Sequence, residues 1–95
     1  MNTAYLVGHI TVKDAEKWDK YRNQVPGTLK PWGGEVTFRG KQVAAFSGDL
    51  PYTDIVVIRF LNKEAINNWH NSPAYQALIP LRREAAEMVL LSYET

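Results

Sequence analysis

The sequence predicts an α+β fold in which helices cover an antiparallel sheet, and three observations support this prediction. Apolar residues at spacings of three and four mark two amphipathic helices, one around Trp18 and one around Trp69. β-Branched and aliphatic runs mark strands at 4–12, 35–39, 55–60 and 88–93. The order β-α-β-(β)-β-α-α-β places adjacent strands between the helices, which is typical of the ferredoxin-like type.

The first strand, residues 4–12, has no helical period. Its alternation predicts two faces, with Tyr5, Val7 and His9 on one and Leu6, Gly8 and Ile10 on the other.

The first helix is predicted to begin after Asp14, a good N-cap residue. Trp18, Tyr21 and Val25 form its apolar stripe. The other side carries polar residues, namely Asp19, Lys20, Arg22 and Asn23. We expect the helix to end near Pro26-Gly27, since proline and glycine both disfavour its continuation.

The middle of the chain predicts strands separated by an irregularity. Val36 and Phe38 form the apolar face of 35–39, and a further short strand is expected in 42–48. Apolar parity changes between them, which requires a bulge or a tight turn at Gly40. After a loop at 49–54, the apolar run 55–60 predicts a central strand covered on both faces, with Arg59 as the exception.

The second helix is predicted to start after Asn62 and to bury Ala65, Ile66 and Trp69. Ser72-Pro73 then starts a short helix that runs to about Ile79, because proline is tolerated at the first helical position. Pro80 kinks or restarts this helix before the last strand.

Composition limits the function classes. Ninety-five residues predict one domain, 1–95. The formal charge, 11 − 10 = +1, gives no field that would attract nucleic acid. The absence of cysteine excludes disulfides, thiolate catalysis and cysteine zinc sites. No signal peptide is recognisable, and no apolar run approaches the roughly 20 residues of a membrane span, so we expect a cytoplasmic location.

Six residues are candidates for ligand binding, and each has a structural alternative: His9, Arg39, Tyr75, Arg82, Trp69 and Tyr21. His9 is either a core or interface residue or an acid/base in a pocket. Arg39 either pairs with Glu35 or holds a carboxylate of a substrate.

The other four candidates lie on predicted helices. Helical spacing places Tyr75 and Arg82 on one stripe if the axis survives Pro80, whereas Arg83 faces water and pairs with Glu87. Their structural role would be to anchor the kinked segment. Tyr21 and Trp69 are either core residues or walls of a pocket between helix and sheet.

The sequence shows no recognisable catalytic pattern. It has no nucleophile elbow, phosphate loop or dinucleotide fingerprint. Two histidines without a carboxylate motif do not make a metal site, so no metal or other cofactor is expected. Catalytic residues therefore cannot be assigned.

Three stretches together resemble a known bacterial family: YLVGHITVKD (5–14), GGEVTFRG (33–40) and NSPAYQALIPLRREAA (71–86). They resemble domain of unknown function 1330, which belongs to the dimeric α/β-barrel superfamily. The resemblance implies a ferredoxin-like fold and a homodimer in which two sheets meet as a barrel with the helices outside.

The family has no established activity, and three hypotheses remain open. The first is a protein that binds or transforms a small organic molecule in a pocket of each subunit, as the resemblance to cofactor-free monooxygenases of the superfamily implies. The second is a non-catalytic dimeric module with a structural or regulatory role. The third is haem binding or degradation, with His9 or His70 as the axial ligand.

Overall fold

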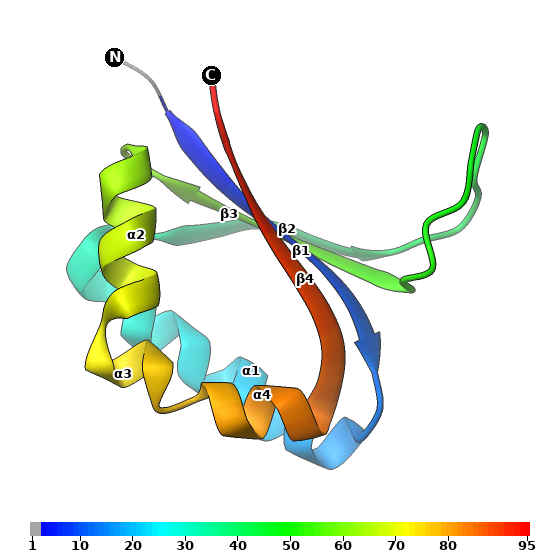
Figure 1. Ribbon diagram of the computed structural model, residues 1–95, viewed down its shortest axis with the longest axis horizontal. Coiled ribbons are helices and arrows are strands. Elements are labelled where there is room, and N and C mark those ends of the chain that lie inside the picture. Colours follow the sequence, from blue (N-terminus) through cyan, green and yellow to red (C-terminus); the bar gives the residue numbers. More distant parts are fainter. Residues whose placement is uncertain (1–2) are drawn as a thin grey trace.

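The four strands form one antiparallel sheet in the order β2-β3-β1-β4 (Figure 1). Their bounds in the computed structural model, which describes residues 3–95, are β1 (Ala4–Val12), β2 (Glu35–Lys41), β3 (Asp54–Phe60) and β4 (Ala86–Glu94). Residues 1 and 2, which the single-domain prediction included, lie outside the described residues. The sheet confirms the predicted α+β fold of the ferredoxin-like type.

The helices gather on one face of the sheet and leave the other face open (Figure 1). Their bounds are α1 (Ala15–Leu29), the 3₁₀ helix η1 (Lys30–Trp32), α2 (Lys63–Asn71), α3 (Pro73–Gln76) and α4 (Ile79–Ala85). The predicted caps are present: side-chain oxygens of Asp14, Asn62 and Ser72 accept hydrogen bonds from backbone N–H groups of the first turns.

The core lies between the helices and the covered face. Its most deeply buried large side chains are Trp69, Tyr75, Phe60, Ile10 and Leu29. The predicted alternation of β1 is confirmed: Leu6 and Ile10 are buried under the helices, and Tyr5, Val7 and His9 are half-buried on the open face. The two faces of the sheet therefore differ in what covers them.

The predicted end of the first helix at Pro26-Gly27 is wrong. α1 continues through both residues to Leu29 because its last turn is buried. Leu29 packs in the core, and the Thr28 hydroxyl accepts a hydrogen bond from the indole nitrogen of Trp69 at 3.0 Å. Tertiary packing outweighs the poor helix propensity of proline and glycine here.

The irregularity in β2 lies at Thr37 and not at Gly40. Val36 pairs with Ile58, but Phe38 pairs with Val57, so Thr37 is an extra residue in a β-bulge. Val36 and Phe38 consequently point to opposite faces, which corrects the prediction of one shared apolar face. Gly40 is an ordinary paired residue of β2.

The expected strand in 42–48 is absent, and the chain there leaves the body of the molecule as a projecting arm (Figure 1). We call residues 42–53 the arm. Its apolar residues Val43 and Phe46 are 96% and 100% exposed. No strand of residues 3–95 pairs with the arm. The alternating apolar residues of the arm are therefore not incorporated into the sheet.

β3 is central but is covered on one face only. Val56, Ile58 and Phe60 are buried, whereas Ile55, Val57 and Arg59 lie on the open face. The guanidinium of Arg59 pairs with Glu35 of the neighbouring strand at 2.9 Å. Glu35 was predicted to pair with Arg39. That pair does not form, because the bulge turns Arg39 to the covered face.

The segment after α2 breaks into two short helices. α3 ends at Gln76, and Pro80 occupies the first turn of α4, where its missing N–H is tolerated. The predicted ion pair between Arg83 and Glu87 does not form, because α4 ends at Ala85 and Glu87 belongs to β4. Glu87 pairs instead with Lys13 at 3.6 Å.

We predict that Thr28→Val lowers the free energy of unfolding by about 1–3 kcal/mol, since it leaves the buried Trp69 N–H without an acceptor at nearly constant side-chain volume. Chemical denaturation measures the loss. The exposed Thr37→Val is the matched control and should change the free energy by less than about 0.5 kcal/mol. Equal losses in the two variants would contradict the role of Thr28.

Candidate functional site

The candidate site lies under the covered face, where α1 faces β2. Trp18, Tyr21 and Arg22 come from α1, and Arg39 comes from β2. Because of the bulge at Thr37, Arg39 pairs with Val56 and therefore points toward the helices. Without the extra residue, Arg39 would lie on the open face beside Glu35.

These residues line two connected spaces. An inner hollow of about 20 Å³ is closed further in by core residues that include Trp69 and Met88. An outer vestibule of about 200 Å³ opens to solvent and is also lined by Lys41 and Asp54, which form an ion pair at 3.3 Å. Trp18, Arg22 and Arg39 line both spaces and so form the passage between them.

A chain of hydrogen bonds stands behind the hollow. The Arg82 guanidinium donates to the Tyr75 hydroxyl at 2.8 Å, and the Tyr75 and Tyr21 hydroxyls lie 2.9 Å apart. Since Tyr75 accepts from Arg82, its own proton is available for Tyr21, and the Tyr21 proton can then point into the hollow. Tyr75 and Arg82 line neither space, so both act through Tyr21.

Burial raises the pKa of Tyr21 well above its ordinary value, and contact with Tyr75 raises it further. The charges of Arg82 and Arg39 oppose this shift without cancelling it. The Tyr21 phenol is therefore held protonated, which suits a hydrogen-bond donor and neither a general acid nor a base.

Arg39, like Arg22, is exposed to solvent, although its guanidinium is partly buried. Burial lowers its pKa, and the neighbouring Arg22 lowers it further, while Tyr21 partly offsets both effects. Among residues 3–95, no carboxylate forms an ion pair with Arg22, Arg39 or Arg82. Asp54 lines the vestibule but pairs with Lys41, so neither arginine of the passage has a carboxylate partner, and this favours an anion between them.

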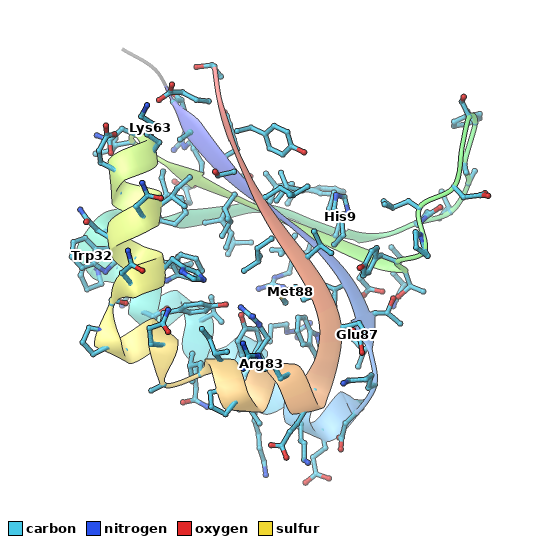
Figure 2. The ribbon with its side chains drawn as sticks, in the orientation of Figure 1. His9, Trp32, Lys63, Arg83, Glu87 and Met88 are labelled. Atoms are coloured by element: carbon cyan, nitrogen blue, oxygen red, sulfur yellow. The ribbon has the colours of Figure 1, made fainter. Side chains whose placement is uncertain are left out.

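The six predicted residues divide into three groups. Arg39, Tyr21 and Trp69 line the inner hollow, and Tyr75 and Arg82 form the chain behind it. His9 is separated from all of them because it lies on the open face, with its ring 6.3 Å from that of Tyr52 (Figure 2). Figure 2 also shows Met88 on the side of β4 that faces the helices.

Sequence reasoning missed Arg22, because it assigned this residue to the polar, solvent-facing side of the first helix. Its position was nonetheless readable, because Arg22 follows Trp18 by four residues and precedes Val25 by three. It therefore borders the buried stripe. Met88 was also missed, since the last strand offered no signal of which face would meet the helices.

Within the part of the chain that the structure describes, no group of three histidine, aspartate or glutamate residues could hold a metal ion. No helix of these residues is long and apolar enough to cross a membrane.

We predict that Tyr75→Phe lowers the free energy of unfolding by about 1–3 kcal/mol, because it leaves the hydroxyl of Tyr21 and the guanidinium of Arg82 without their partner. Tyr93→Phe is the control, since Tyr93 is 54% exposed on the open face. Denaturant unfolding of both variants provides the comparison. If the two substitutions cost the same, the chain of hydrogen bonds contributes nothing to stability.

Tyr21 also predicts a dependence of stability on alkaline pH. Below the ordinary pKa of 10.0 both the folded and the unfolded chain hold the Tyr21 proton, so its contribution is constant. Above 10.0 the unfolded chain releases this proton while the folded chain keeps it, so the free energy of unfolding falls as the pH rises. In Tyr21→Phe this decline should be shallower than in the wild type, and an unchanged slope would contradict the raised pKa.

Comparisons with known proteins place this site in a family. Residues 3–95 match the family described as domain of unknown function DUF1330. No curated protein matches the chain. Several solved structures share its fold, and three of them are informative.

The first is RPA0582 of Rhodopseudomonas palustris, a protein of unknown function, with 14% identity and a TM-score of 0.83 over 99% of this chain and 82% of that one. The second is SnoaB, a cofactor-independent oxygenase from Streptomyces nogalater, with 10% identity and a TM-score of 0.72 over 98% and 92%.

The third is a dimeric ferredoxin-like protein of unknown function from Thermobifida fusca. It has 10% identity and a TM-score of 0.68 over 99% of this chain and 92% of that one. At such identities the likeness shows the fold alone, and it agrees with the ferredoxin-like arrangement described above. The family match covers nearly the whole chain, and the protein therefore belongs to the DUF1330 family.

Proposed function

We propose that the protein binds a small organic acid in the vestibule, with the acid group between Arg22 and Arg39. The observation that carries this proposal is the meeting of these two guanidiniums at one passage, with no ion pair to a carboxylate of residues 3–95. Burial lowers the pKa of Arg39, and repulsion from Arg22 lowers it further. A bound anion would relieve this repulsion and form charge-assisted hydrogen bonds.

The size of the two spaces limits the ligand. The inner hollow, at about 20 Å³, holds little more than one water molecule. The ligand therefore occupies the vestibule of about 200 Å³, which is below the range of drug-sized pockets. Trp18 offers an aromatic face beside the arginines, so a compact acid with a flat apolar part fits best.

Tyr21 lines the hollow and not the vestibule, so it would act on a bound ligand through a ligand atom or a water molecule that occupies the hollow. The protonated Tyr21 hydroxyl lines the hollow, with Tyr75 and Arg82 as positioning residues behind it. A donor held in this way stabilises negative charge that develops on a ligand oxygen. SnoaB is described as a cofactor-independent oxygenase, which supports the possibility of catalysis on this fold without a cofactor.

The same proposal includes a homodimer that buries the open faces of two sheets, as in a dimeric α/β barrel. A row of apolar side chains crosses all four strands of this face, from Phe38 through Val57 and Val7 to Leu91. The dimeric relative from Thermobifida fusca supports a second copy as its cover. His9 lies on the same face and is then an interface residue. The cytoplasmic location and the absence of a nucleic-acid partner stay predictions from the sequence.

Benzoate, with neutral benzamide as its uncharged counterpart, tests the acid site. We predict that benzoate raises the thermal stability of the wild type and that benzamide does not. In Arg39→Gln and Arg22→Gln the dissociation constant of benzoate, measured by calorimetry, should rise about tenfold or more, because each loses one charge-assisted contact. High salt should weaken binding as well.

Arg83→Gln is the matched control, since Arg83 is an exposed arginine of α4 that lines neither space. It should bind benzoate as the wild type does. Equal binding of benzoate and benzamide, or equal losses in all three variants, would contradict the site. A chain that binds no small acid would instead favour the non-catalytic dimeric module.

A further inference from the structure

The arm is anchored at its base and unsupported at its tip. At the base, the Gln42 amide donates to the carbonyls of Leu50 and Tyr52 at 3.1 and 2.7 Å, and the Gln42 backbone N–H donates to Thr53 at 2.7 Å. The Lys41–Asp54 ion pair, at 3.3 Å, closes the same end. The arm therefore leaves the sheet in a defined direction (Figure 1).

The tip, residues 43–48, makes no hydrogen bond to any other part of residues 3–95. All six residues are exposed, and the side chains of Val43 and Phe46 are almost completely so. Gly48, with φ +73°, turns the chain back toward the body. An anchored base and an exposed apolar tip with unpaired backbone groups are typical of a segment that binds a partner chain.

A hollow of about 400 Å³ lies between the arm and the open face of the sheet. His9 and Ile55 line it from the sheet, and Tyr52, Leu50 and Ala45 line it from the arm. The hollow thus adjoins the apolar row, because His9 and Ile55 lie two residues along their strands from Val7 and Val57. Arm and open face form one surface, and any partner of the open face also meets the arm.

We propose that the arm clasps a second copy of this chain, with Phe46 of each copy buried against the open sheet face of the other. This inference rests on the homodimer proposed above and adds the arm to its interface. A two-fold arrangement is self-complementary, so the apolar tip and the apolar face of one chain serve both halves of the contact. A chain of this size also gains more from burying such surface than a larger domain would.

The test compares Phe46→Ser with Leu61→Ser by sedimentation at micromolar concentrations. Leu61 is the matched control because it is also an exposed apolar residue, at 77%, but follows the opposite end of β3. The wild type should be a dimer. Phe46→Ser should raise the dimer dissociation constant by about tenfold or more, and Leu61→Ser should leave it unchanged.

A label on the arm gives an independent readout. The chain has no cysteine, so Ser47→Cys carries a single environment-sensitive dye beside Phe46. Its emission should shift to the blue as protein concentration rises through the dimerisation range, because the tip leaves water. A shift that does not follow dimerisation would overturn the clasp.

The outcomes separate the two ideas. A wild-type dimer whose dissociation constant is insensitive to Phe46→Ser overturns the arm and leaves the homodimer standing. A wild-type monomer overturns both and leaves the acid site untouched. Equal weakening by Phe46→Ser and Leu61→Ser overturns the specific role of the tip, and circular dichroism of both variants confirms that they are folded.

Discussion

The helical layer depends on the hydroxyl of Tyr75. Tyr75 lies on α3, is fully buried, and bonds both to Tyr21 of α1 and to Arg82 of α4. Its ring also packs 4.1 Å from that of Trp69 on α2. Four helices that share one face of the sheet are thus tied at a single side chain. A network of buried polar groups has this effect only when each member has a partner, and this one is satisfied.

The bulge at Thr37 makes a separate contribution, because it decides which side of the sheet each β2 residue serves. It sends Phe38 to the open face and Arg39 to the covered face. Glu35, before the bulge, remains on the open face and neutralises Arg59. Arg39 is thereby separated from Glu35 and lies on the side of Arg22, and the proposed acid site depends on this one extra residue.

The sequence predicted those features that depend on local chemistry. The caps at Asp14, Asn62 and Ser72 and the alternation of β1 follow from spacing within one element. Tyr75 and Arg82 do meet, at 2.8 Å, but from two separate helices, α3 and α4, and not from the one continuous stripe that was predicted. The family resemblance also predicted the ferredoxin-like fold. The errors arose where tertiary contacts decide: burial of Leu29 carries α1 past Pro26, and the position of the bulge depends on pairing with β3.

The residues of the candidate site were likewise predictable where local spacing marks them and not where a neighbouring strand decides. Tyr21 and Trp69 stood out because they are aromatic residues on inner helix faces, whereas Arg39 stood out because it precedes the glycine at which a bulge or turn was expected. Arg22 did not, since an arginine at the border of a helix stripe looks solvated until the neighbouring strand is known. His9 was attractive as an acid/base candidate, but strand parity alone already set it apart from Leu6 and Ile10.

The two faces of the sheet are not independent, because Phe38 and Arg39 are consecutive. Phe38 ends the apolar row of the open face, and Arg39 lines the passage under the helices. A second copy that covers Phe38 restrains the backbone on which Arg39 is mounted, and an anion held by Arg39 restrains the backbone that presents Phe38. The proposed acid site and the proposed dimer interface therefore share one stretch of backbone in β2.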